Sequence, residues 1–194
     1  MDSKVLEVVL GRPPVYNEVE WRLMSRTRAK DKGTVAIYQT SRTAMDRLDE
    51  AHGVAGWSSS FNAIVQSPEL WVVECTIQAN GHYWMDVGGA EVDPDKPGGA
   101  PPYKSAYSDA FKRAAVQAVP GFRYLYIHTL GGNYYALKET GSPYFHADAE
   151  KEIERDVRVA IGRMWEDWNA RLAALDYGPW VVWTGPGDAL AWAV

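Results

Sequence analysis

The chain has 194 residues, of which 46% are hydrophobic and 23% are charged, and its formal net charge is −5. This length and apolar fraction are sufficient for one ordinary domain with a hydrophobic core and an appendage. The single cysteine, Cys75, excludes an intrachain disulfide, and no apolar run is long enough to span a membrane, so we expect a cytoplasmic protein without membrane contact.

The charge is distributed unevenly along the chain. Residues 22–47 hold seven Arg and Lys against two Asp, a balance of +5, whereas residues 131–194 hold six basic and ten acidic side chains, a balance of −4. Nucleic-acid-binding proteins are usually basic overall, which this chain is not. The distribution nevertheless permits a basic groove in the first two-thirds of the chain.

The first 53 residues predict a short helix, a β-hairpin and a second helix. Residues 3–10 form the short helix, and residues 19–28 alternate as a half-buried strand with Arg26 and Arg28 on its outward face. A basic turn at residues 29–33 leads into a second strand at 34–39, so the tip of the hairpin is a candidate phosphate clamp. Ser41 is the expected N-cap of the next helix and Gly53 its C-terminal stop.

Three further strands are predicted to form an antiparallel meander. They cover residues 57–66, 70–78 and 82–87, and Asn80-Gly81 between the last two is a strong hairpin signal. The Gly- and Pro-rich residues 88–102 that follow predict a mobile loop. Its Asp93-x-Asp95-x-x-Gly98 resembles a calcium loop, but Lys104 stands where the loop needs a bidentate Glu, so we expect no metal there.

A central amphipathic helix is predicted over residues 103–118, between Pro101-Pro102 and Pro120-Gly121. Lys104, Ser108 and Lys112 lie four residues apart on its flank with the small Ala115 beside them, and Arg113 projects from the far side. These charges form either an ordinary solvated face or a surface that a phosphate backbone can approach closely. The helix's apolar arc, which should face the core, consists of Tyr103, Tyr107, Ala110, Phe111, Ala114 and Ala118.

The last third of the chain predicts a short strand, a long helix and an apolar tail. Residues 134–137 form the strand, and apolar residues recur at helical spacing from 147 to 175. The helix is expected to dock on its own domain or on a neighbouring subunit. The tail from residue 177 is strongly apolar, which favours a subunit contact, with disorder as the alternative.

Two motifs carry a resemblance to a known family. Ser108-Asp-Ala-Phe-Lys-Arg-Ala-Ala115, followed by Arg123-Tyr-Leu-Tyr126, resembles the signature of the Rad52 superfamily of single-strand annealing proteins, including bacterial and phage members of the DdrA type. Upstream, residues 42–53 with Gly56-Trp57 are similar to that family's first core helix and strand entry. The chain departs from the pattern at residues 119–122, where the family tends to have Phe-Gly-Ile-Gly.

The resemblance, which covers about residues 17–130, implies an α+β fold with a β-β-β-α core of antiparallel strands packed against the central helix. It divides the chain into an annealing core, residues 1–130, and a C-terminal helical extension, residues 131–194. It also implies a homo-oligomeric ring that binds single-stranded DNA. Lys112 and Arg113 match the family's basic pair, Lys104 matches an earlier basic position, and Arg26 and Arg28 correspond loosely to a basic hairpin.

The expected function is therefore ATP-independent binding and annealing of complementary single strands in recombination and double-strand-break repair. No triphosphate-binding loop, paired metal-ligand spacing or serine-nucleophile motif is present, so we expect no cofactor, no metal and no enzyme activity. Three alternatives stay open: protection of DNA ends without annealing, a purely structural oligomer, and a metal-dependent nuclease built from Glu74, Asp86 and Glu91.

Overall fold

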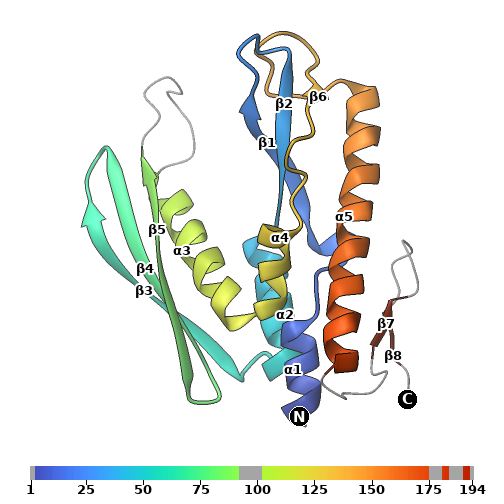
Figure 1. The fold of residues 1–194 in the computed structure, drawn as a ribbon. Helices are drawn as coiled ribbons and strands as arrows, with labels where there is room; N and C mark the ends of the chain where they lie inside the picture. The colour runs from blue at the N-terminus through green and yellow to red at the C-terminus, as the bar shows by residue number, and fades with distance from the viewer. Residues whose placement is uncertain (1–2, 92–101, 175–180, 184–189, 193–194) are drawn as a thin grey trace. The chain divides into compact units, whose positions relative to one another are not determined.

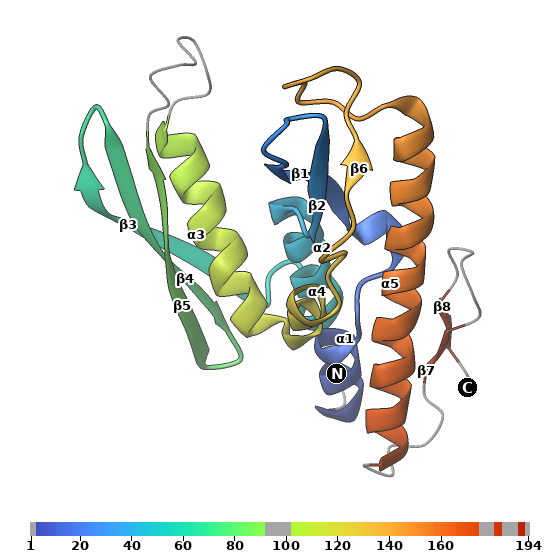
Figure 2. The same ribbon diagram turned by 45° about the horizontal axis from the view of Figure 1, so that its top comes forward.

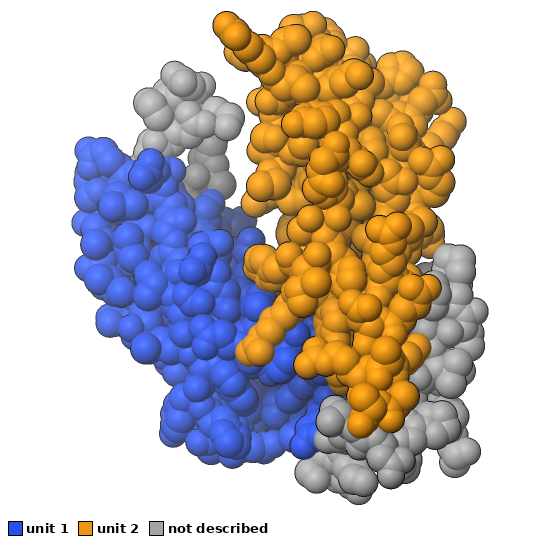
Figure 3. All heavy atoms as spheres, in the orientation of Figure 1, with its two compact units in different colours: residues 1–11, 40–121 blue, residues 12–39, 122–194 orange. Residues whose placement is uncertain are grey.

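The computed structural model describes residues 3–91, 102–174, 181–183 and 190–192. They belong to two compact units, each built from two separate stretches of the chain (Figure 3). Unit 1 comprises residues 1–11 and 40–121, and unit 2 comprises residues 12–39 and 122–194. The α+β class is confirmed. The division at residue 130 follows the extent of the family resemblance and stays a prediction.

Unit 1 contains the predicted three-stranded meander. Strands β3 (Trp57–Gln66), β4 (Leu70–Ala79) and β5 (His82–Glu91) pair antiparallel in the order β3-β4-β5 (Figure 1). Asn80 and Gly81 join β4 to β5 with φ angles of 49° and 78°. Two consecutive positive φ angles are the geometry that a two-residue hairpin requires, so the Asn-Gly signal is confirmed.

Helix α3 (Pro102–Ala118) lies across one face of this sheet, over β4 and β5 (Figures 1 and 2). The predicted β-β-β-α core is therefore confirmed. The helix buries a ridge of mostly small side chains, which allows a close approach to the sheet: Ala106, Ala110, Phe111, Ala114, Ala115 and Ala118. Tyr103, expected in the apolar arc, is 49% exposed and contacts Trp71 at a ring distance of 5.7 Å.

Strand β5 is longer than the sequence predicts. Gly88 to Glu91 continue the strand and pair with β4, where a mobile loop was expected. That prediction was wrong for these four residues because Gly88 serves a packing role: a Cβ atom there would lie 2.1 Å from the backbone nitrogen of Ala110. Glycine thus permits contact between the strand and α3. The rest of the expected loop, including the calcium-like Asp93 and Asp95, lies outside the described residues.

Two more helices complete unit 1, namely α1 (Ser3–Gly11) and α2 (Ser41–His52). The N-cap of α2 is Thr40, whose side chain accepts a hydrogen bond from the Thr43 N–H at 3.1 Å. The prediction of Ser41 as N-cap was wrong by one residue; its hydroxyl instead faces α3. Gly53 ends the helix with a φ of 76°, as predicted.

Unit 2 combines the N-terminal hairpin with the C-terminal part of the chain. Strand β2 (Lys32–Tyr38) pairs with β1 (Glu20–Arg26) on one side and with β6 (Tyr135–Ala136) on the other. Both the hairpin and the short strand are confirmed. The remaining elements of the described chain are the 3₁₀ helices η1 (Tyr16–Glu18) and η2 (Pro120–Arg123), helix α4 (Tyr124–Ile127), helix α5 (Ala147–Ala174), and strands β7 (Val181–Trp183) and β8 (Leu190–Trp192).

The long C-terminal helix α5 docks on unit 2, and the predicted helix at residues 147–175 is confirmed. Its Trp165 is fully buried and donates a hydrogen bond from Nε1 to the carbonyl of Pro14 at 3.1 Å. The hydroxyl of buried Tyr135 in β6 donates to Asp156 at 2.9 Å. None of the described helices is long and apolar enough to cross a membrane. Most of the apolar tail lies outside the described residues, so its expected role stays a prediction.

Cys75 lies on the helix-facing side of β4 and is fully buried. Burial raises the pKa of its thiol to about 11. Because only the thiolate reacts, we expect alkylation by iodoacetamide at pH 8 to be at least about 100-fold slower in the native protein than in the unfolded chain. Mass spectrometry of samples alkylated with and without urea measures this ratio. Equal rates would contradict the burial of Cys75.

Candidate nucleic-acid interface

The candidate cations of unit 1 lie on the part of α3 that the sheet does not cover. Successive residues of a helix are separated by 100°, so Lys112 and Arg113 lie on two different sides of the exposed face of α3. Lys104, in the first turn of the helix, is exposed. The small buried residues on the opposite face fix this orientation, because rotating the helix would bring the charges into the sheet.

The Lys112 side of α3 faces helix α2. The hydroxyl of Ser108, one turn before Lys112, lies 3.1 Å from the hydroxyl of Ser41 in the first turn of α2. Ala115, two turns after Ser108, is fully buried. The expectation that Ala115 lies beside the lysines to admit a phosphate backbone was wrong, because its methyl group packs in the core of unit 1 instead.

The Arg113 side of α3 faces strand β5. The Arg113 Nε donates to Oδ1 of Asp86 at 3.2 Å, and the Gln117 amide donates to Oδ2 at 3.1 Å. The N–H of Val87 also donates to Asp86 Oδ1 at 2.7 Å. Burial alone would raise the pKa of Asp86, but these hydrogen bonds and the Arg113 charge together lower it. Asp86 therefore stays ionised and partly neutralises Arg113.

The Arg113–Asp86 pair leads to a prediction for DNA binding. We expect Asp86→Asn to increase affinity for single-stranded DNA about 2- to 5-fold, because it removes a negative charge that competes with phosphate for an exposed guanidinium. With its oxygen in the place of Oδ1, the asparagine can still accept the hydrogen bond from the Val87 N–H, which limits the structural change, whereas the hydrogen bond from Gln117 to Oδ2 is lost. Fluorescence anisotropy of a labelled oligonucleotide at fixed salt measures the affinity; a loss of affinity would contradict a role for Arg113 in binding phosphate.

The two candidate arginines of the hairpin belong to unit 2. Arg26 ends β1, and its guanidinium donates from Nε and Nη2 to the carbonyl of Ser142 at 3.3 and 3.2 Å. It thus holds the segment after β6 against the hairpin. Arg28, predicted on the outward face of the strand, lies beyond its end in the exposed turn, because β1 ends at Arg26. It makes no hydrogen bond or ion pair with any described residue.

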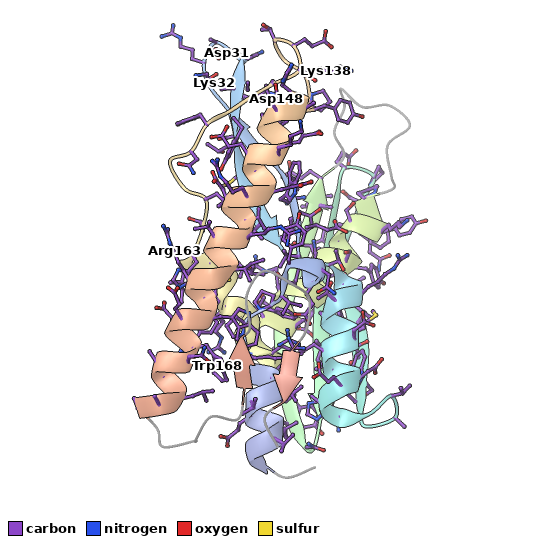
Figure 4. The ribbon with its side chains drawn as sticks, turned by 90° about the vertical axis from the view of Figure 1, so that its right-hand side faces the viewer. Asp31, Lys32, Lys138, Asp148, Arg163 and Trp168 are labelled. Carbon is purple, nitrogen blue, oxygen red and sulfur yellow. The ribbon has the colours of Figure 1, made fainter. Side chains whose placement is uncertain are left out.

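One more cation, Lys138, lies near the hairpin tip, and the sequence did not predict it. Lys138 lies at the same end of unit 2 as Asp31 and Lys32 (Figure 4). The backbone explains this proximity, since Leu137 donates its N–H to the carbonyl of Asp31 at 2.9 Å. The pairing of β2 with β6 brings these residues close together. Because they are about 100 residues apart along the chain, the sequence alone does not predict that they are neighbours.

The basic segment 22–47 is divided between the two units. Its residues 22–39 belong to unit 2 and residues 40–47 to unit 1. Arg47 is only 1% exposed and donates a hydrogen bond to the carbonyl of Val9 at 3.1 Å. This arginine connects α2 to α1 within unit 1 and contributes to folding rather than to the surface charge that the sequence analysis assigned to it.

The carboxylates of the nuclease alternative do not converge on one site. In the register of the sheet, Asp86 is opposite Cys75 and so faces α3, whereas Glu74 is opposite Val87 and faces the other side. Glu91 is four residues further along β5 than Val87, about 13 Å away. Among the described residues, no three His, Cys, Asp or Glu side chains form a group that could hold a metal ion.

Comparison with known proteins identifies the family. The model of the Rad52/22 family of double-strand break repair proteins matches residues 7–139, a range that holds both three-stranded sheets and α3. The chain belongs to the Rad52/22 family. No curated protein matches the chain. Members of the Rad52/22 family bind DNA, oligomerise and act in double-strand break repair, and the match ends before α5. The likeness to DdrA-type members stays a prediction.

Proposed function

We propose that this Rad52/22 family protein binds single-stranded DNA through its phosphates and anneals complementary strands without ATP. The observation that carries the proposal is that Lys104, Lys112 and Arg113 all lie outside the buried face of α3, whose small residues pack against the sheet. Phosphate contacts suit annealing because they bind the strand without sequence preference and leave the bases available for pairing.

Counterion release supplies much of the binding free energy in this mechanism. Each phosphate that a lysine or arginine neutralises releases condensed counterions. A plot of the logarithm of the affinity against the logarithm of the salt concentration therefore has a slope of roughly −0.7 for each phosphate contact. Arg28 at the hairpin tip of unit 2 is a further candidate contact for a phosphate of the strand. Arg26 acts as a positioning residue, since its guanidinium holds the carbonyl of Ser142.

The proposed assembly is a cytoplasmic homo-oligomeric ring in which the α3 cations of neighbouring copies follow one another. A strand bound along such a track is held extended, and its bases remain exposed to a complementary strand. Repetition also compensates for the small number of cations on each copy, because many weak contacts on one strand give high avidity. The net charge of −5 per chain is compatible with this arrangement, since the acidic excess lies in residues 131–194.

Annealing of two complementary dye-labelled oligonucleotides tests the proposal. The protein is expected to accelerate annealing without ATP and without a divalent ion, in EDTA, and both strands should stay intact when magnesium is added. Binding of single strands without acceleration would favour end protection. Shortened strands that require magnesium would contradict the proposal and favour the nuclease alternative.

A further inference from the structure

The sheet of unit 1 has two edge strands, and their backbones differ in how they are covered. On β5, the Gln117 amide donates to the carbonyl of Met85 at 3.0 Å, and Asp86 accepts the N–H of Val87 at 2.7 Å. Side chains thus occupy backbone groups near the middle of this edge. Charged residues at Asp86 and Glu91 further hinder a second strand from pairing with β5.

Strand β3, the other edge, lacks such protection. It contains neither a charged residue nor a proline in its ten residues, WSSSFNAIVQ. Within the part of the chain that the structure describes, the backbone of residues 58–66 forms hydrogen bonds with β4 alone. Three large apolar side chains of β3 are also exposed to solvent: Phe61 by 40%, Ile64 by 53% and Val65 by 38%.

A long, uncharged and partly apolar edge strand promotes pairing with another strand, and natural proteins usually block it with charges, prolines or bulges. The one such device on β3 is the register shift between Ala63 and Val65. The stretch from Trp57 to Ala63 before it is regular, and its centre is Ser60, the last of three consecutive serines. Small side chains at the centre allow a second backbone to approach.

We propose that the β3 edges of two copies of the chain pair antiparallel about a two-fold axis at Ser60. The two three-stranded sheets then become one six-stranded sheet. A second copy fits this edge because β3 pairs with itself without opposing any charges. The other free edges among the longer described strands carry charges: β1 has Glu20, Arg22 and Arg26, and β5 has Asp86 and Glu91.

This contact is independent of DNA and goes beyond the proposed function. A two-fold contact uses the same surface on both copies and closes after two of them. A ring requires a different, head-to-tail contact. The β3 contact therefore doubles the number of chains in whatever assembly the head-to-tail contact forms.

Disulfide trapping of the full-length protein tests the pairing. Directly opposed residues of antiparallel strands have Cα atoms about 4.5–5.5 Å apart, which a disulfide can bridge. Ser60→Cys is therefore expected to form a covalent dimer within minutes of mild oxidation. Cys75 does not interfere, because its thiol is buried.

Gln78→Cys is the matched control. Gln78 lies on the same face of the sheet in β4, opposite Ser58, and is exposed. In the proposed dimer the two β4 strands are three strand spacings apart, about 14 Å, so Gln78→Cys should stay monomeric on a denaturing gel. Equal cross-linking of the two variants, or none of Ser60→Cys, would overturn the proposal.

Light scattering gives a second, non-covalent readout. Ser60→Lys places a charge at the centre of the edge and is expected to halve the mass of the assembly, while Gln78→Lys leaves it unchanged. Because both side chains are exposed, each variant should keep the wild-type circular dichroism spectrum. An unchanged mass of a folded Ser60→Lys protein would also overturn the proposal.

Discussion

Lys112→Ala/Arg113→Ala is expected to reduce affinity for single-stranded DNA about 10- to 100-fold. This range follows from about 1.5 kcal/mol for each charge-assisted bond to phosphate, less part of the Arg113 contribution, because that guanidinium must leave Asp86. The salt dependence should change as well: the log–log slope should become shallower by roughly 1.4, or 0.7 for each phosphate that the variant no longer neutralises. Fluorescence anisotropy over a range of salt concentrations measures both quantities.

Lys151→Ala/Arg155→Ala is the matched control for this removal of charge. Both residues lie exposed on α5, beyond the matched residues 7–139, and form ion pairs with neighbours on the same helix. The control removes the same formal charge and should leave affinity and salt slope nearly unchanged. If both double variants weakened binding equally, general electrostatic attraction rather than the face of α3 would explain the binding.

Gly88→Ala is expected to destabilise the protein by about 3 kcal/mol, which for a chain of this size lowers the melting temperature by about 6–12 °C. An added Cβ atom would lie 2.1 Å from the nitrogen and 2.6 Å from the Cα of Ala110. Both atoms belong to the backbone of α3, so no side-chain rotation relieves the clash. The helix must move away from β5, which weakens the packing of its buried residues.

The neighbouring glycine provides the control for Gly88. A Cβ atom at Gly89 would have its closest neighbours at 3.5 and 3.9 Å, which are ordinary contact distances. Gly89→Ala should therefore leave the melting temperature almost unchanged or raise it slightly, since alanine restricts the unfolded chain. Calorimetry of the two variants measures the difference. A similar melting temperature for both would contradict close packing of α3 on β5.

Local sequence signals predicted most of the fold. Asn80-Gly81 determined the hairpin because few residues adopt two consecutive positive φ angles, and the prolines beside residues 103–118 marked the ends of α3. The errors involve contacts between distant residues. Gly88 resembles a loop residue in the sequence, and only the position of Ala110 above it explains why a strand contains glycine there.

The sequence predicted where the candidate cations lie on α3, but it did not predict which charges pair with them. Helical spacing placed Lys112 and Arg113 outside the apolar arc of α3, as the structure has them. The partner of Arg113 was not identified, although strand alternation places Asp86 on the same face as Trp84 and Gly88, toward the helix. Arg47 shows the opposite error: a cation in a basic segment is buried because a backbone carbonyl accepts its hydrogen bond.

The annealing rate of complementary strands without ATP tests the central claim most directly. Mixing experiments with dye-labelled oligonucleotides should compare the wild-type protein, Lys112→Ala/Arg113→Ala and Lys151→Ala/Arg155→Ala at the same protein concentration. We predict that the wild type and the α5 control accelerate annealing and that the α3 variant retains little of this acceleration. Equal acceleration by all three proteins would contradict the assignment of DNA binding to α3, and no acceleration by the wild type would contradict the annealing function itself.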